Sequence, residues 1–405
     1  MSAYRKHYNC QDVLIKLVES WRHDLDNNCN IGSVMMDLSR AFDSMPRGLL
    51  LAKLKAYGVD ENSCKLLCSY LSNRMQRVKI CNTRSEWTCT NRGFPQGSGL
   101  GPLLYNIFGN DLFHFINVSS LYNYADDNTI SYSHNDVNNM LNVLETDCKV
   151  AIEWFTSNYM QANPDKFQVL FLSRANIDPF PAEIVIDNVH IARCTNVKLL
   201  GVTIDEKLKF DDHVDIICAK ASRQLNALIR IRRNLTYKQR LKIYESFILS
   251  NFNVCPVVWH YCSVKSTRKM ENIQKRALRF LTDDKESNYL QLLETTNLPS
   301  LTLQRLKCIA IEVFKCLHKL NPSFMSDMFK VKDLKYNMRR SISLESPVFK
   351  TVSYGKKSFL YNGCHLWNEL PDDMCNISSL SLFKKLLKLW AGPKCNCNMC
   401  NVYCF

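Results

Sequence analysis

The spacing of hydrophobic and polar positions changes near residue 205. Before that point, short apolar runs predict buried strands, and they alternate with segments in which apolar residues recur at helical spacing. The expected helices are Gly48–Tyr57, Asn62–Leu71, Pro102–Ile116 and Val137–Tyr159. The expected strands and hairpins are Ser33–Leu38, Leu121–Tyr132, Phe167–Ser173, Ile184–Arg193 and Lys198–Ile204. Residues 1–205 are therefore predicted to be mixed α and β.

From about Asp211 onward the pattern predicts helices. The segment His213–Arg233 is expected to turn four apolar residues inward, namely Ile217, Leu225, Leu228 and Ile229. Thr236 is expected to cap a second helix, Tyr237–Ser250, and Ser266–Leu281 is the third. The last seventy residues contain several prolines and are expected to be irregular.

Composition limits the class of protein. A chain of 405 residues with 46% hydrophobic and 22% charged residues is expected to fold into two or three domains. No apolar run approaches the ~20 residues that cross a bilayer, and the N-terminus lacks the apolar core of a signal peptide. The 19 cysteines are mostly scattered singly, as in reduced intracellular proteins. We therefore expect a cytoplasmic and nuclear protein and exclude a membrane protein or a secreted miniprotein.

Positive charge is concentrated in one stretch. The net charge is +14, and residues 217–280 alone hold 14 Lys and Arg against two acidic residues. Such a surface attracts polyanions, and phosphate neutralisation is its commonest use. The alternative is a solvated helical face without a partner.

Two adjacent acids stand out at a predicted hairpin tip, in Tyr124-Ala125-Asp126-Asp127. Adjacent carboxylates repel each other, so ordering them requires a nearby cation. A third acid, Asp37, ends another apolar strand, and two such strand ends side by side suit a pair of divalent ions. The alternative is an ordinary exposed turn, as expected for Asp211-Asp212.

Five segments occur in a characteristic order: Met36–Asp43, Arg92–Ser98, Tyr124–Asp127, Asn163–Lys166 and Leu199–Val202. In this order the chain resembles the reverse transcriptases of non-LTR (LINE-like, jockey-type) retrotransposons. The first three segments are similar to motifs A, B and C, the fourth to motif D and the fifth to the primer-grip region. The resemblance extends over nearly the whole chain.

The resemblance implies roles for specific residues. Asp37, Asp126 and Asp127 match carboxylates that bind two Mg²⁺ ions, and the carbonyl of Leu38 matches a backbone ligand. Lys166 matches a lysine proposed to protonate pyrophosphate, although lysines after turns are usually only solvated. The implied partners are an RNA template, a DNA primer and deoxynucleoside triphosphates.

Four further residues match the nucleotide-binding part of the family. Phe42 matches the residue beneath the incoming sugar, where a bulky ring excludes a ribose 2′-hydroxyl; the alternative is an ordinary core aromatic. Gln96 and Gly97 match nucleotide-contacting positions of motif B, and Arg5 matches a fingers residue. The chain reaches Asp37 about 32 residues after Arg5, so by this resemblance we expect the front of the fingers to be missing.

The expected fold class is α+β. The architecture is a right-hand polymerase palm with partial fingers (1–205), an all-helical basic thumb (206–330) and an irregular C-terminal appendage with a Cys-rich tail (331–405). The predicted nucleic-acid-binding residues are the basic side chains of the thumb, Arg230, Arg232, Arg233, Lys238 and Arg240.

The tail ends in Cys395, Cys397, Cys400 and Cys404, enough thiols for one Zn²⁺, but the spacing fits no standard zinc motif. Free thiols are the alternative. The predicted function is RNA-directed DNA polymerase of a mobile element. Two rival functions are a truncated, inactive nucleic-acid-binding relic of such an element and a protein that packages element RNA.

Overall fold

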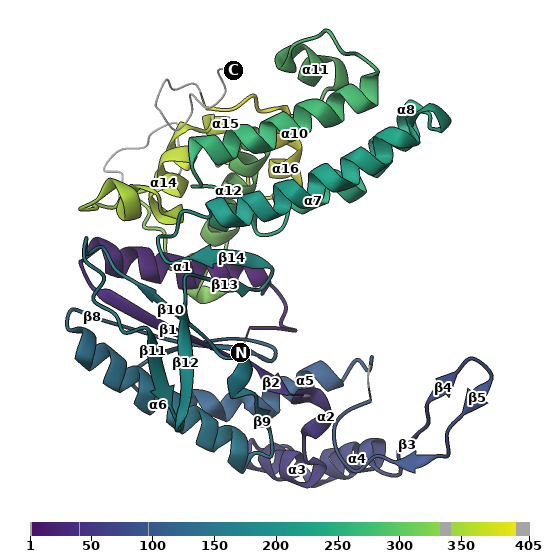
Figure 1. Ribbon diagram of the computed structural model, residues 1–405, viewed down its shortest axis with the longest axis vertical. Helices are drawn as coiled ribbons and strands as arrows, with labels where there is room; N and C mark the ends of the chain where they lie inside the picture. The colour runs from purple at the N-terminus through teal and green to yellow at the C-terminus, as the bar shows by residue number, and fades with distance from the viewer. Residues whose placement is uncertain (1, 40, 96, 333–341, 394–405) are drawn as a thin grey trace. The chain divides into compact units, whose positions relative to one another are not determined.

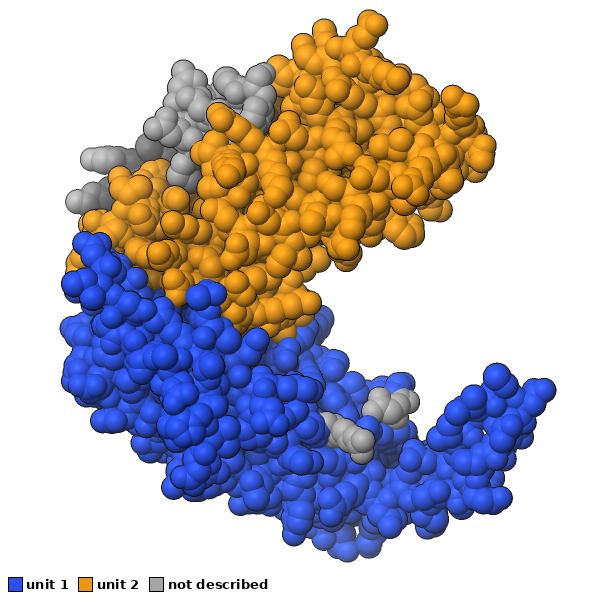
Figure 2. All heavy atoms as spheres, in the orientation of Figure 1, with its two compact units in different colours: residues 1–9, 28–195 blue, residues 10–27, 196–405 orange. Residues whose placement is uncertain are grey.

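The computed structural model describes residues 2–39, 41–95, 97–332 and 342–393. The chain divides into two compact units (Figure 2). Unit 1 comprises Met1–Asn9 and Asn28–Thr195, and unit 2 comprises Cys10–Asn27 and Asn196–Phe405. Residues 10–27 thus group with the second half of the chain. The division into three domains stays a prediction.

A six-stranded sheet forms the centre of unit 1, with strand order β11-β12-β10-β1-β8-β7 (Figure 1). Its strands are β1 (Asn30–Met36), β7 (Ser120–Tyr124), β8 (Asp127–His134), β10 (Gln168–Leu172), β11 (Glu183–Ile186) and β12 (Val189–Cys194). Strand β1 pairs antiparallel with both β8 and β10, and it is almost wholly buried. Strand β1 is hydrogen-bonded on both sides, and its apolar residues and Ser33 are all buried.

Helix α6 (Val137–Ser157) lies along one face of the sheet and packs against β1, β8 and β11 (Figure 1). Its buried Leu144 and Cys148 follow the helical spacing predicted from the sequence. The other helices of unit 1 are α2 (Ala41–Ser44), α3 (Arg47–Ala56), α4 (Glu61–Leu71) and α5 (Gly101–Gly109). The remaining strands are short: β2 (Leu38–Ser39) pairs with β9 (Gln161–Ala162), β3 (Met75–Gln76) with β6 (Thr88–Cys89), and β4 (Lys79–Ile80) with β5 (Thr83–Arg84).

Unit 2 is mostly helical. Its helices are α1 (Cys10–Asp26), α7 (Asp211–Arg230), α8 (Tyr237–Ile243), α9 (Pro256–Trp259), α10 (Val264–Thr282), α11 (Tyr289–Thr296), α12 (Leu301–Leu317), α13 (Ser323–Ser326), α14 (Phe359–Glu369), α15 (Asp372–Cys375) and α16 (Leu380–Leu389). A hairpin of β13 (Asn196–Leu199) and β14 (Val202–Asp205) precedes them.

Carboxylates join the helices of unit 2 by accepting hydrogen bonds from backbone amides that have no partner within their own helix. The Glu19 carboxylate on α1 accepts from the amides of Phe359 and Leu360 at 2.7 and 2.9 Å, where α14 begins. Glu271 on α10 accepts from the amide of Thr302 at 2.8 Å, in the first turn of α12. A helix N-terminus leaves amides without intrahelical partners, so these contacts join elements distant in sequence. The Glu19 contacts tie residues 10–27 to the C-terminal half of the chain.

Several elements predicted from the sequence are confirmed. Thr236 accepts from the amide of Gln239 and forms a capping box at the start of α8, and the β11–β12 hairpin turns at Asp187 and Asn188. Three predictions of local structure are wrong. Lys198–Ile204 is a hairpin with its turn at Leu200 and Gly201, not one strand.

The first predicted helix of the basic region ends at Arg230, and Ile229 is 41% exposed rather than turned inward. The described part of the C-terminal appendage is not irregular, because α14, α15 and α16 lie within it. Within the described part of the chain, every helix is too short or too polar to cross a membrane.

Candidate active site

The first candidate carboxylate, Asp37, follows the central strand of unit 1. The residues before it, Met35 and Met36, are buried, whereas the Asp37 side chain is 40% exposed. The Asp37 carbonyl accepts from the amide of Asn163 at 3.0 Å, and β2 pairs with β9 directly after it. These bonds place the turn before β10 beside Asp37.

Asp126 and Asp127 lie at the tip of the β7–β8 hairpin, as predicted. Ala125 has a φ of 56°, in the left-handed region that non-glycine residues rarely adopt. Two buried amides support this turn. Asn123 donates to the carbonyl of Ala125 at 3.0 Å and to the side chain of Asn128 at 2.7 Å, and Asn128 donates to the carbonyl of Asp126 at 3.0 Å.

The sheet register brings the acids of the two strands together. Met36 pairs with Asn128, so the residue after Met36 and the residue before Asn128 leave the sheet side by side. These residues are Asp37 and Asp127. Antiparallel pairing therefore gathers Asp37, Asp126 and Asp127 at one end of the sheet, although the first is 89 residues away in sequence.

The charges at this end are unbalanced. Burial raises the pKa of Asp127, and the negative charges of Asp126 and Asp37 raise it further. Burial also raises the pKa of the Tyr105 hydroxyl, with Asp126 and Asp127 adding to the effect. A raised carboxyl pKa means that the ionised form is disfavoured, which is the condition that a bound cation relieves.

A lysine supplies part of the missing positive charge. Lys166, at the end of the 3₁₀ turn Pro164–Lys166, places its Nζ 3.2 Å from Oδ2 of Asp37. Its side chain is 65% exposed. The sequence predicted both residues as catalytic but did not predict that they form an ion pair.

The donor set suits a hard divalent cation. Carboxylate oxygens are the ligands that Mg²⁺ prefers, and Mg²⁺ is usually held by one or two carboxylates while it keeps several waters. Among the residues that the structure describes, no three His, Cys, Asp or Glu side chains already form a group that could hold a metal ion. The three aspartates thus provide suitable oxygens without a preformed cage.

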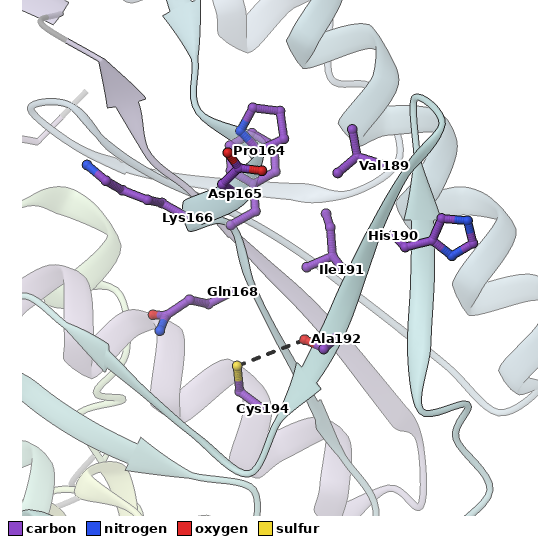
Figure 3. A pocket seen from close by; sticks show the side chains of 10 residues that line it. Pro164, Asp165, Lys166, Gln168, Val189, His190, Ile191, Ala192 and Cys194 are labelled. Carbon is purple, nitrogen blue, oxygen red and sulfur yellow. Dashed lines mark hydrogen bonds between the residues drawn. The ribbon is translucent and has the colours of Figure 1, made fainter.

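A cavity of about 630 Å³ adjoins the same turn (Figure 3). It is lined by residues 164–168 of the turn and β10 and by residues 189–192 and Cys194 of β12. Figure 3 shows the Lys166 side chain extending away from Val189 and Ile191. Its amine therefore faces the carboxylates rather than the β12 wall of the cavity.

Phe42, the predicted sugar-contacting residue, is partly buried on α2. Its ring stacks on Tyr105, with centroids 4.3 Å apart and planes 19° apart, and Tyr4 approaches edge-on at 6.3 Å. Tyr105 itself is only 2% exposed. The ring of Phe42 is thus held from one side by the buried ring of Tyr105.

Gly93 joins the segments that carry Phe42 and the motif B residues. It has a φ of +72°, and a Cβ added there would lie 2.7 Å from Cα of Asp43. Its amide donates to the carbonyl of Met45 at 2.8 Å. Only glycine permits this approach of the two backbones.

For the other predicted nucleotide-binding residues, the structure gives only local geometry. Gly97 has a φ of +75° with no atom within 4 Å of an added Cβ, and the guanidinium of Arg5 lies 4.4 Å from the ring of Tyr8. Leu38 is buried on β2 and pairs with Ala162. Gln96 lies outside the described residues, as do the four cysteines of the predicted zinc site.

The five predicted nucleic-acid-binding residues of unit 2 divide into two groups. Arg230, Arg233 and Lys238 are exposed. Arg232 and Arg240 instead form ion pairs with Asp283, at 2.9 and 2.6 Å.

Arg240 also donates to the carbonyls of Phe280 and Leu281, where α10 ends. Cations and donors at a helix C-terminus satisfy its last carbonyls. These two arginines therefore contribute to the fold of unit 2.

Sequence reasoning missed four residues that shape the candidate site: Gly93, Tyr105, Asn123 and Asn128. The two asparagines had a detectable signal, because they are cross-strand partners on either side of the tight turn and asparagine commonly bonds turn backbone. Tyr105 had none, since its contact with Phe42 joins residues distant in sequence.

Comparison with known proteins shows which family the chain resembles. Residues 2–204 match the family model described as reverse transcriptase (RNA-dependent DNA polymerase). The "Probable RNA-directed DNA polymerase from transposon BS" of Drosophila melanogaster is 26% identical over 297 residues, covering 69% of this chain and 32% of that protein. The "RNA-directed DNA polymerase from mobile element jockey" of Drosophila funebris is 24% identical over 287 residues, covering 68% of this chain and 31% of that protein.

The match thus spans about a third of the length of these relatives. Among solved structures, an apo telomerase from Candida Tropicalis aligns with 80% of this chain and 57% of its own, with a TM-score of 0.39 and 12% identity. A likeness at this level does not establish a shared fold.

Proposed function

The chain belongs to the reverse transcriptase (RNA-dependent DNA polymerase) family, and we propose that it is the RNA-directed DNA polymerase of a LINE-like mobile element. It adds deoxynucleotides to the 3′-hydroxyl of a primer and releases pyrophosphate. The observation that carries this proposal is the sheet register, which sets Asp37 beside the Asp126-Asp127 tip. Unit 1 serves as the palm with partial fingers, and the basic helices of unit 2 serve as the thumb.

We infer that the three aspartates, with the carbonyl of Leu38, hold Mg²⁺. Two Mg²⁺ ions held by these residues would activate the primer hydroxyl and neutralise the triphosphate. The raised pKa of Asp127 supports this inference, because the repulsion among the carboxylates is what a divalent cation removes.

Lys166 is proposed to protonate the leaving pyrophosphate. Its amine already lies in the carboxylate cluster, 3.2 Å from Asp37, and more than half of its side chain is exposed. An exposed lysine on a short turn can reorient between a carboxylate and a phosphate oxygen. The ion pair with Asp37 is then the resting arrangement.

Phe42 is proposed to select deoxynucleotides by steric exclusion of a 2′-hydroxyl. The stacking partner Tyr105 supports this role, because a ring held from behind cannot retreat from a bulkier sugar. Discrimination by a clash requires such rigidity.

Unit 2 is proposed to hold the template–primer through its phosphates. The exposed side chains of Arg230, Arg233 and Lys238 are available for this, and a cavity of about 290 Å³ between α7 and α10 is lined in part by Lys269 and Arg276. Contacts of this type position a duplex without reading its sequence.

The test is primer extension on an RNA template by the purified chain. Asp126→Asn removes one charge and keeps the shape, so extension should fall by orders of magnitude while RNA binding persists. Asp187→Asn is the matched control, because Asp187 is an exposed aspartate at another hairpin tip of the same sheet. RNA binding without extension by the unmodified chain would favour the relic, and equal extension by Asp126→Asn would contradict the assigned site.

A further inference from the structure

Residues 72–89 form an arm that the proposed function does not use. The arm follows α4 and consists of two short antiparallel ladders, β3 with β6 and β4 with β5 (Figure 1). Every residue from 72 to 89 is exposed, and the arm projects from the rest of unit 1 in Figure 2. A two-stranded hairpin without packing is marginally stable in water, so an arm of this kind is expected to gain its order from a partner.

The arm exposes apolar side chains that its own fold does not cover. Met75, Val78, Ile80 and Trp87 are 53%, 63%, 70% and 53% exposed. The guanidinium of Arg77 lies 4.4 Å from the ring centroid of Trp87. Four exposed apolar side chains on one short arm suggest that the arm is an interaction site.

The charge of the arm points to a polyanion. It carries Arg74, Arg77, Lys79 and Arg84 but only one acid, Glu86. Lys79 and Arg84 are cross-strand partners, and like charges directly opposite each other destabilise a sheet. Within the described residues neither of the two forms an ion pair with a carboxylate. An anion bound between them would remove this repulsion, which an uncharged partner surface would not do.

We propose that the arm binds single-stranded nucleic acid, with an unpaired base stacked on Trp87 and phosphates held by Lys79 and Arg84. Alternating stacking and phosphate contacts are how proteins hold single strands without sequence preference. This inference rests on the proposed function in one respect, because it takes the bound single strand to be the RNA template of the polymerase.

The stacking contact is tested by fluorescence anisotropy with the full chain and a labelled oligouridylate. Trp87→Ala should weaken binding about 5- to 150-fold, the range for losing one stacked base, and Trp87→Phe should recover most of the affinity. The same substitution should leave affinity for double-stranded RNA unchanged, because paired bases are not available to stack. Equal oligouridylate affinity for all three proteins would overturn the stacking assignment.

The phosphate contacts are tested by salt titration. Lys79→Glu combined with Arg84→Glu should make the negative slope of log affinity against log salt shallower by about 1.4. The slope is about −0.7 for each phosphate contacted on a single strand. The matched control is Lys55→Glu with Lys149→Glu, which makes the same charge change at exposed positions of unit 1 off the arm. The inference is wrong if both double variants change the slope equally, since the effect would then reflect net charge alone.

The arm and the active site can fail separately. Arm variants should need more template for half-maximal extension, whereas Asp126→Asn should lose extension at every template concentration. Loss of strand binding in arm variants, in a chain that extends no primer, would refute the polymerase and leave the arm inference standing. If the arm variants extend primers fully and bind the single strand as the unmodified chain does, the arm inference is wrong and the polymerase proposal stands. Trp87 would then be tested against a protein partner.

Discussion

The ion pair between Lys166 and Asp37 predicts that removing the proposed proton donor tightens metal binding. In the structure the amine occupies one oxygen of a carboxylate that the proposed Mg²⁺ must also use. A cation that binds Oδ2 of Asp37 therefore has to displace Lys166. Lys166→Met removes this competition and one positive charge, and both changes favour the cation.

The expected magnitude follows from the exposure of the pair. The two side chains are 65% and 40% exposed, so the pair is a surface ion pair. Such pairs contribute about 0.2–1 kcal/mol, which corresponds to roughly 1.4- to 5-fold tighter Mg²⁺ binding in the variant. Because exposed pairs are screened, the difference should shrink at high salt. Primer extension should fall at the same time, since the proposed proton donor is lost.

Isothermal titration of Mg²⁺ into the full chain, without nucleotide, measures the affinity directly. Lys166→Arg keeps a cation in reach of Asp37 and should behave like the unmodified chain. Lys149→Met, on the exposed face of α6, controls for the loss of one charge. Unchanged or weaker Mg²⁺ binding by Lys166→Met would refute the competition, whatever happens to extension.

Four further predictions follow from single residues. Gly93→Ala and Gly97→Ala both place alanine at φ near +70°, which costs about 1–2 kcal/mol. The added Cβ at Gly93 also lies 2.7 Å from backbone, so Gly93→Ala should show the clearly larger loss of stability in chemical denaturation. Burial and neighbouring carboxylates raise the pKa of Asp127, so its ionised form opposes folding above that pKa; Asp127→Asn should raise the Tm at neutral pH, and the gain should disappear as the pH falls below about 4. Phe42→Ala should increase ribonucleotide use relative to deoxynucleotide use in single-turnover extension, and an unchanged ratio would return the ring to a core role. Arg233→Glu should weaken template binding for all sequences alike and flatten the salt slope by about one, whereas sequence-dependent loss would contradict a phosphate contact.

Elements set by neighbouring residues could be predicted from the sequence. The β7–β8 hairpin, helix α6 and the Thr236 cap depend on alternation, helical spacing and a capping side chain, all within a few residues. Each is governed by local backbone chemistry. The order of the acidic motifs likewise predicted the candidate carboxylates before any geometry was known.

Predictions failed where an apolar run hid a turn or where exposure depended on packing. Leu199–Val202 looks continuous, yet Leu200 and Gly201 have positive φ values and reverse the chain. Ile229 fits a helical face by spacing, but near the end of α7 that face is exposed. The helices α14 to α16 were missed because nearby prolines suggested irregular chain, although Pro371 precedes α15 and is compatible with a helix start.

The sequence by itself determined the candidate site residues: two adjacent acids at a tight turn, a third acid after a buried strand, and a basic helical region. Only the tertiary structure decided which of them act together. Lys166 forms an ion pair with Asp37, 129 residues away in sequence. Arg232 and Arg240 form ion pairs with Asp283, although charge alone had grouped them with the exposed basic residues. The reason is physical, because charge and spacing are local properties of a chain, whereas the partner of a charged side chain is set by strand register and helix packing between segments far apart in sequence.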